Sequence, residues 1–345
     1  MKRLSIIAIA IIAALLVSCN IDATDGIYSE AAASTESTAV TIRSYLGQDV
    51  RGDYYYLTDE GVFKIGSEKA LFSSGNGRII RAASLLADGS LLILRQNTDP
   101  AEGARVSYHK YEDGVYADAV LIEGKYSDLL TNGLFYNSTG IYSYSGTGTA
   151  ATSLLGNMAV KDVKALVNGN HAFFEIEDPS GAYKVYVFEA GNNTPLVNGI
   201  DKANLTNPTY CSGFQATDGT GSNYIVLYRV PSNSKLQVYS MTATAVSADA
   251  SATIDYSNNQ SPSFLFDGCV YIKDANSFKK IKLEDYSTEQ ITTGFAANLR
   301  TAEITNILPA KDTNGAVIDG VFIAGTKSSM LYRIDMNENT STQIK

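Results

Sequence analysis

The chain has 345 residues, with 36 acidic and 27 basic side chains and a formal net charge of −9. An acidic surface repels nucleic acid and anionic lipid head groups, so neither is expected as a direct partner of the folded part. The two histidines and three cysteines lack the spacing of zinc ligands. We therefore expect no metal site and no cofactor.

The first 19 residues have the three parts of a bacterial secretory leader. Lys2 and Arg3 supply positive charge, and residues 6–17 form an apolar run that ends just before Ser18 and Cys19. This run is shorter than the roughly 20 residues that a membrane-spanning helix needs. Its last residues, Leu-Val-Ser-Cys, resemble the lipobox of bacterial lipoproteins. The resemblance implies that signal peptidase II cleaves between Ser18 and Cys19, and that Cys19 receives fatty acyl chains such as palmitate.

A lipidated cysteine would tether the protein to a membrane. Removal of residues 1–18 takes away two positive charges and leaves a net charge of −11. A single acyl chain binds membranes only marginally, so the several chains implied by the lipobox make a stable anchor. Residues 19–41 are small and polar beyond the cysteine, which predicts a flexible tether with a reach of roughly 25 Å. Asn20 stands where many inner-membrane lipoproteins carry aspartate, which favours the outer membrane, facing the periplasm or the cell surface.

A strand–turn–strand pattern recurs through residues 42–345. Tyr- and Phe-rich apolar segments alternate with polar, glycine-rich turns, and the first segment of each copy begins near residues 54, 91, 134, 171, 224, 270 and 320. The average spacing of about 44 residues is typical of β-propellers, whose blades are four-stranded sheets. Continuous apolar runs such as Leu91–Leu94 are expected to be the inner strands, buried on both faces.

The fold class expected from this pattern is all-β, a propeller with about seven four-stranded blades. Two β-sandwich domains would also give many short strands with glycine-rich turns, and they remain the alternative. A further weak copy could lie within 195–222 or 285–310. The stretch 158–167 is ambiguous between a helix and a strand. The absence of tryptophan argues against the propeller families whose repeats are marked by that residue.

Few residues point to chemistry. Cys211 and Cys269 could form a disulfide in an oxidising envelope or remain buried thiols. The two histidines have no recognisable nucleophile or acid partner in the sequence, and no serine-elbow motif occurs. The run Tyr54, Tyr55 and Tyr56 is the best candidate for ligand contact, because tyrosine combines apolar area with a polar tip. Packing between sheets is the alternative role for these tyrosines.

The sequence therefore predicts a lipid-anchored cell-envelope protein that acts as a non-catalytic binding or scaffolding module. Its expected partners are the membrane, through the anchor, and a protein or glycan. An envelope enzyme, such as a glycan hydrolase or lyase with an active site in the central funnel, is the alternative. Carboxylates clustered at the funnel mouth would favour that enzyme.

Overall fold

The computed structural model describes residues 41–75, 77–97, 99–168, 171–189, 192–201, 209–217, 222–230, 235–241, 245–256 and 262–344. The expected signal peptide, Cys19 and nearly all of the expected tether lie outside these residues. Thr41–Lys345 forms one compact unit. Among the described residues, no helix is both long and apolar enough to cross a membrane.

The described strands fall in chain order into seven four-stranded antiparallel sheets and one small hairpin. The first three sheets contain β1 (Ile42–Gln48), β2 (Tyr54–Thr58), β3 (Gly61–Lys64), β4 (Phe72–Ser73); β5 (Arg78–Leu85), β6 (Leu91–Asn97), β7 (Ala104–His109), β10 (Val120–Leu121); and β11 (Asp128–Leu129), β12 (Phe135–Asn137), β13 (Gly140–Ser143), β14 (Thr152–Ser153). The hairpin β8 (Tyr111–Glu112) and β9 (Val115–Tyr116) is an insertion in the second sheet.

The later sheets follow the same order. They contain β15 (Asp162–Asn168), β16 (His171–Glu177), β17 (Tyr183–Glu189), β18 (Val197–Asp201); β19 (Thr209–Thr217), β20 (Ser222–Val230), β21 (Lys235–Met241), β22 (Val246–Asp255); β23 (Ser263–Phe266), β24 (Cys269–Asp274), β25 (Ser277–Lys282), β26 (Thr288–Ile291); and β27 (Ile304–Lys311), β28 (Val317–Thr326), β29 (Leu331–Asp335), β30 (Thr340–Gln343). Short 3₁₀ turns are η1 (Pro100–Glu102) and η3 (Gly294–Leu299).

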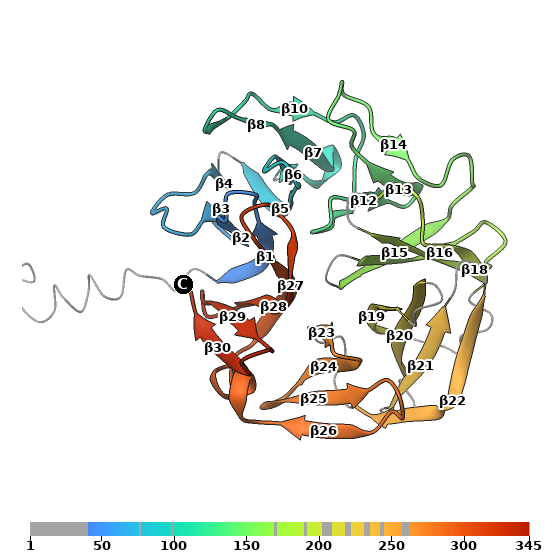
Figure 1. The fold of residues 1–345 in the computed structure, drawn as a ribbon. Helices are drawn as coiled ribbons and strands as arrows, with labels where there is room; N and C mark the ends of the chain where they lie inside the picture. Colours follow the sequence, from blue (N-terminus) through green and yellow to red (C-terminus); the bar gives the residue numbers. More distant parts are fainter. Residues whose placement is uncertain are drawn as a thin grey trace, which may run out of the picture. The chain divides into compact units, whose positions relative to one another are not determined.

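The sheets are arranged around a common centre, each with its first strand innermost (Figure 1). Neighbouring sheets contact each other through these inner strands, and β1 contacts β27, so the ring closes. The expectation of an all-β propeller arrangement of four-stranded sheets is confirmed, and separate sandwich domains are not formed. The ambiguous stretch 158–167 falls largely on strand β15, and the regions 195–222 and 285–310 supply strands of the same sheets.

The sequence interpretation misplaced the inner strands. Leu91–Leu94 lies in β6, which is the second strand of its sheet, and β5 is the inner strand. The run is continuously apolar because β6 is sandwiched between two neighbouring sheets. Inner strands such as β5 (RIIRAASL) carry small and charged residues, and β1, β5 and β27 are interrupted by bulges. Bulges bend a strand and break its alternation, so the periodic signal is weak there.

Two side chains form hydrogen bonds across the seam between the first and last sheets: Asn306, and Gln48, whose Oε1 accepts the backbone N–H of Lys311 at 3.2 Å. Asn306 on β27 accepts a hydrogen bond from the backbone N–H of Tyr45 at 2.9 Å and donates one to the Tyr45 carbonyl at 2.7 Å. The side-chain amide thus makes the same two hydrogen bonds to the Tyr45 backbone that a residue of a neighbouring strand would make. Every sheet consists of its own strands, so closure uses these side-chain hydrogen bonds and packing rather than a strand exchanged between the ends of the chain.

The hydrophobic core lies between adjacent sheets. One cluster joins the first and second sheets and includes the buried Tyr55, Val62, Ile80 and Ile93. Equivalent clusters fill the spaces between the second and third, third and fourth, fifth and sixth, sixth and seventh, and seventh and first sheets. Each fully buried aliphatic or aromatic side chain contributes about 1.5–3 kcal/mol through removal of apolar surface from water.

One type of turn follows several inner strands. In the segments 49–52, 86–89, 130–133 and 312–315, the N–H of the closing glycine donates to the carbonyl of the first residue. These glycines have φ of 80–87°, a left-handed conformation that residues with a Cβ rarely adopt. The turns mark what we call the carboxyl end of the ring, where β1, β5, β11 and β27 finish. The opposite end is the amino end.

Candidate functional site

The residues predicted to carry the anchor, Ser18 and Cys19, lie outside the described residues, so lipidation stays a prediction. Cys269 begins β24 as a buried free cysteine. Cys211 belongs to β19, and its side chain lies outside the described part. The structure therefore has no disulfide at Cys269, and thiol counting on protein taken from envelopes would test whether one forms there.

The three tyrosines predicted to contact a ligand open strand β2. Tyr55 is 1% exposed and Tyr56 is 5% exposed. The Tyr56 ring stacks on Phe63 with centroids 5.6 Å apart, and the half-buried Tyr54 ring lies 6.4 Å from that of Tyr45. Packing between sheets therefore occupies Tyr55 and Tyr56, and neither ring offers a free face to a ligand.

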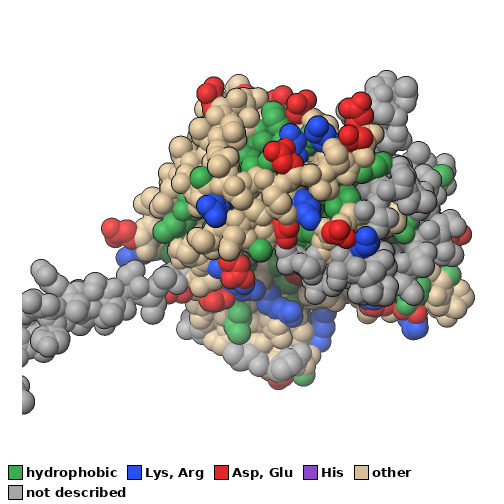
Figure 2. Space-filling view, turned by 90° about the horizontal axis from the view of Figure 1, so that it is seen from below, with side chains coloured by type: hydrophobic (Ala, Val, Ile, Leu, Met, Phe, Trp, Pro, Cys, Tyr) green, Lys and Arg blue, Asp and Glu red, His purple; other side chains and the backbone are tan. Residues whose placement is uncertain are grey.

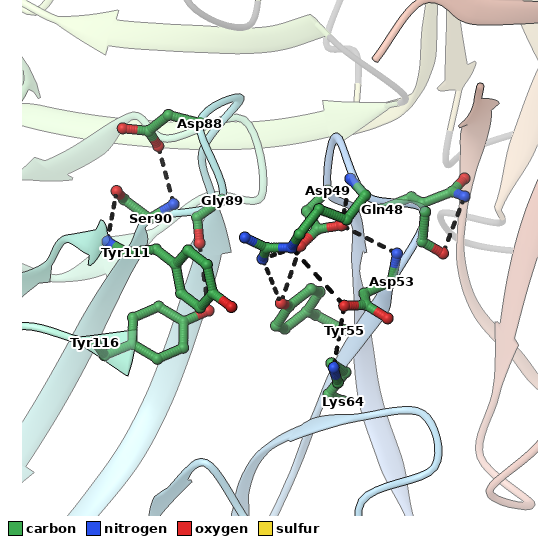
Figure 3. Close-up of polar contacts among 12 residues, drawn as sticks. Gln48, Asp49, Asp53, Tyr55, Lys64, Asp88, Gly89, Ser90, Tyr111 and Tyr116 are labelled. Atoms are coloured by element: carbon green, nitrogen blue, oxygen red, sulfur yellow. Dashed lines mark hydrogen bonds and ion pairs between the residues drawn. The ribbon is translucent and has the colours of Figure 1, made fainter. Parts of the chain in front are cut away.

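The Tyr55 hydroxyl belongs to a polar network centred on Asp49 (Figure 3). It donates to Asp49 Oδ2 at 3.1 Å, and the Arg51 guanidinium also donates to this oxygen. Asp49 Oδ1 accepts the backbone N–H groups of Arg51 and Asp53 at 2.9 and 3.0 Å. Burial raises the pKa of Tyr55, so it stays a neutral donor. With these contacts made, Asp49 has little capacity left for a ligand.

The same network fastens the inserted hairpin β8–β9 to the turns after β1 and β5, in the first and second sheets. The Arg51 guanidinium lies 3.8 Å from the centroid of the Tyr111 ring, and the Tyr111 N–H donates to Ser90 Oγ at 3.2 Å. Tyr116 Oη donates to the Gly89 carbonyl at 3.3 Å. We interpret the cluster as structural, because its charged groups are paired with one another and the Tyr111 and Tyr116 rings pack edge to face, with centroids 4.9 Å apart.

A cavity of about 400 Å³ opens at the carboxyl end of the ring. It is lined by the ends of β1, β5 and β27, the turn after β11 and the end of β13. Its volume lies in the range of small-molecule sites, about 300–1,000 Å³. Among the described residues that line it, Lys311 is the charged side chain, and its backbone N–H is tied to Gln48 Oε1 at 3.2 Å.

Two buried polar groups in this lining lack partners. Asn132 is 8% exposed and Ser143 is 6% exposed, and among the described residues neither Asn132 Nδ2 nor Ser143 Oγ makes a hydrogen bond. The Asn132 Oδ1 atom accepts the Leu134 N–H at 3.3 Å, which fixes the orientation of the amide. An unpaired buried polar group costs about 1–3 kcal/mol, so both atoms are suited to a polar occupant of the cavity.

The described lining has few groups that transfer protons at neutral pH. Its described side chains include no carboxylate and no histidine, so Ser143 has no general base beside it. What remains, besides Lys311, is a set of amide and hydroxyl side chains, backbone groups of the turns and apolar walls. In the described part of the chain, no group of three or more histidine, cysteine or acidic side chains could hold a metal ion.

The two histidines considered in the sequence, and the acidic Glu177, lie elsewhere. His109 is buried, with Nε2 2.9 Å from Ser107 Oγ, and burial together with the nearby Arg95 charge lowers its pKa to about 4. His171 is half-buried at the start of β16. Glu177 forms an ion pair with Lys161. None of them lines the central cavity.

Sequence reasoning missed Asn132 and Ser143. The segment Leu130-Thr-Asn-Gly133 has the composition of a tight turn, and that signal places Asn132 at a strand end. It does not reveal that the amide points to the ring centre, because this depends on the closure of sheets that are distant in the sequence.

Comparisons with known proteins support the fold alone. No protein-family model matches the chain, and no curated protein matches it. The extracellular domain of the one component system BT4673 from B. thetaiotaomicron aligns with a TM-score of 0.50 and 14% identity, covering 86% of this chain and 38% of that one. Sqt1 of Saccharomyces cerevisiae aligns with a TM-score of 0.49 and 10% identity, covering 89% and 85%. A prolyl endopeptidase aligns with a TM-score of 0.49 and 12% identity, covering 93% and 54%.

Proposed function

We propose that this protein is a lipid-anchored lipoprotein of the bacterial cell envelope whose propeller domain binds a protein or glycan without catalysing a reaction. In this proposal, Cys19 holds the chain at the membrane, and an uncharged polar group of the partner enters the central cavity. The observation that carries the proposal is the pair of unpartnered buried atoms, Asn132 Nδ2 and Ser143 Oγ, in the cavity wall.

The geometry favours a hydroxyl or amide as the group that enters. Asn132 Nδ2 can donate a hydrogen bond, and Ser143 Oγ can donate one and accept others. Sugar hydroxyls, acetamido groups and peptide amides all combine a donor with an acceptor. A site built to hydrogen-bond such a group rejects an analogue that lacks it, because its own buried groups would then stay unpaired.

The charge of the lining also supports binding. A glycan hydrolase needs two carboxylates about 5–10 Å apart. The described lining has no carboxylate, and its one charged side chain is Lys311. The alternative of a funnel enzyme is therefore less well supported than recognition.

The binding proposal is tested with the purified full chain on an array of envelope oligosaccharides and peptides. We expect one class of neutral ligand to bind, and affinity to fall at least about tenfold in Asn132→Leu and in Ser143→Ala, since each removes about one hydrogen bond. The matched control is Ser153→Ala, an exposed serine in β14 of the same sheet.

The outcomes of that array are distinct. Equal affinity of Ser143→Ala and Ser153→Ala for every bound ligand would place recognition elsewhere. Turnover of a bound glycan would overturn the non-catalytic part of the proposal. If no member of the array binds to the full chain, the proposed binding role of this cavity is wrong.

The anchor is tested separately in cells. We expect radiolabelled palmitate to enter the wild-type chain and the protein to partition into detergent. Cys19→Ala should abolish both and leave an unprocessed chain of higher mass. Cleavage at another position, or a free Cys19 thiol in the mature protein, would contradict the anchor while leaving the binding proposal intact.

A further inference from the structure

A second cavity, of about 710 Å³, lies at the amino end on the face of the second sheet that packs against the first. Strands β5, β6 and β7 have 8, 7 and 6 residues, whereas β3 and β4 of the first sheet have 4 and 2. The longer strands therefore extend past the first sheet at this end. The part of the cavity lined by Arg78, Arg95 and Arg105 lies on the uncovered part at the amino end, whereas His109, further along β7, packs on Phe72 of β4.

On this face of the second sheet, side chains change from apolar to basic at the point where the first sheet no longer packs against it. On β6, Ile93 is buried against the first sheet, and Arg95, two positions further, lines the cavity. On β5, Ile80 is buried and Arg78 lines the cavity. Arg105 on β7 is the ladder partner of Arg95. Adjacent strands are about 4.8 Å apart, so the three arginines cross one face within about 10 Å.

These arginines lack the acidic partners that other arginines of the chain have. Arg43 and Arg333 each pair with an aspartate, at 3.5 and 3.0 Å. Within the described part of the chain, Arg78, Arg95 and Arg105 make neither an ion pair nor a side-chain hydrogen bond. By contrast, acidic and basic side chains are both present across the face seen in Figure 2. On an acidic protein, three unpaired arginines in one cavity form a local excess of positive charge.

The arginines repel one another in the empty cavity. Arg95 is half-buried, and burial followed by the charge of Arg78 lowers its pKa. An anion placed between the guanidinium groups would relieve this repulsion and accept their parallel N–H donors. The rim adds Lys125, whose Nζ donates to the Ala101 carbonyl at 2.9 Å, and the exposed Glu102.

The wall beside the arginines supplies neutral donors. Ser107 and His109 follow Arg105 on the same face of β7, and both are buried and line the cavity. The His109 ring packs on Phe72, with centroids 4.4 Å apart. A neutral imidazole bonded to a serine hydroxyl can give one further hydrogen bond without adding charge. The cavity therefore combines a fixed positive row with a polar wall.

We propose that this cavity is a binding site for a small ligand that carries an oxyanion, such as a phosphate, sulfate or carboxylate group, held by Arg78, Arg95 and Arg105. The cavity is large enough for a ligand of about disaccharide size. This site is separate from the central cavity, at the opposite end of the ring, and does not depend on the function proposed there.

The test is calorimetric titration of the full chain at fixed ionic strength with pyrophosphate, sulfate, citrate and digalacturonate, and with a neutral disaccharide for comparison. We expect at least one anionic probe to bind and the neutral probe not to bind. Arg95→Gln should weaken the anion at least about tenfold, because it removes a bidentate charged donor. Arg81→Gln is the matched control, since Arg81 lies on β5 and donates to Gln96 Oε1 at 3.0 Å instead of lining the cavity.

Thermal unfolding without ligand separates loss of the site from loss of the fold. Arg95→Gln should melt at the same temperature as wild type or higher, because it relieves repulsion. Loss of binding with an unchanged or raised melting temperature supports the proposal. Equal affinities of Arg95→Gln and Arg81→Gln would overturn it, as would the failure of every anionic probe to bind. The preferred probe then identifies whether phosphate, sulfate or carboxylate is the cognate group.

Discussion

The two cavities of this propeller differ in position and in charge: one lies at the carboxyl end of the ring and is nearly neutral, and the arginines of the other lie at the amino end. The central cavity at the carboxyl end is nearly neutral, and its distinguishing atoms are an amide nitrogen and a hydroxyl without partners. The cavity at the amino end holds three unpaired arginines. Tight turns that converge on the ring centre form the first, whereas strands of unequal length in adjacent sheets form the second. Residues at the strand ends and turns thus determine the polarity of the cavities, whereas residues at the strand centres form the hydrophobic core.

The largest effect is expected from breaking the seam beside the central cavity. Asn306→Ala removes two hydrogen bonds to the Tyr45 backbone and should lower the free energy of unfolding by about 2–4 kcal/mol. Because β1 and β27 both line the central cavity, its ligand should bind more weakly, while the oxyanion should bind to folded protein as before. Urea unfolding and titration measure these quantities. The control is Asn157→Ala, at an exposed asparagine, which should change the free energy of unfolding by less than about 0.5 kcal/mol. If both variants lost the same free energy of unfolding, Asn306 would have no special role in the seam.

A second prediction uses pH to test the burial of His109 in the wall of the basic cavity. The pKa of His109 is lowered to about 4, so below pH 6.5 the unfolded chain takes up a proton that the folded chain refuses. Stability should therefore fall between pH 6.5 and 4, and this group contributes a loss of up to about 3 kcal/mol. In His109→Phe that contribution disappears, so the wild type should lose up to about 3 kcal/mol relative to the variant as the pH falls from 6.5 to 4. Parallel curves from urea unfolding at several pH values would contradict this assignment.

A third prediction concerns a carboxylate introduced into the basic cavity. Arg105→Glu places a carboxylate opposite Arg95, the ladder partner of residue 105. Affinity for pyrophosphate should fall about a hundredfold, because the variant removes one charged donor and engages the half-buried Arg95, and each hydrogen bond to a charged group is worth about 1.5–3 kcal/mol. Arg105→Lys keeps the charge but loses the planar fork, so a smaller loss of about tenfold is expected. Calorimetric titration measures both variants, and similar losses in the two would show that geometry rather than charge dominates.

The smallest effect concerns the orphaned hydroxyl of the central cavity. Without ligand, Ser143→Ala removes an unsatisfied buried group and should raise the free energy of unfolding by about 1 kcal/mol. Ser153→Ala on the exposed strand β14 should leave it unchanged. Denaturant unfolding checks both variants. A loss of stability in Ser143→Ala would mean that its hydroxyl is already satisfied, and the binding proposal would lose its main support.

The repeat pattern predicted the class of fold because second strands such as β6 are buried between two sheets and stand out as apolar runs. It could not predict the inner strands, since β11 has only two residues and β5 is bulged. The tyrosine run predicted a contact surface, but Tyr55 and Tyr56 face neighbouring sheets. Residue type alone could not decide between packing and exposure there.

Neither cavity could be derived from motifs. Arg78, Arg95 and Arg105 are separated in the sequence and become neighbours only through the pairing of three strands. A usable signal exists in the alternation, because Ile93-Leu94-Arg95 replaces an apolar residue with arginine on the same face. Recognising it requires knowing how far the adjacent sheet extends, and the short strand β4 gives no sequence signal of its length.

The construction of each sheet from consecutive strands has a consequence for how the chain can be cut and rejoined. Since no ladder links the first segment to the last, a circular permutant opened between two sheets, for example at the hairpin-free loop before β15, would keep every strand pair intact. Ile42 at the start of β1 and Ile344 just after β30 pack in the same hydrophobic cluster, so a short linker can join the two ends of the ring. The N-terminus of such a permutant would lie at a former internal loop. An N-terminal anchor could therefore be attached beside any of the sheets.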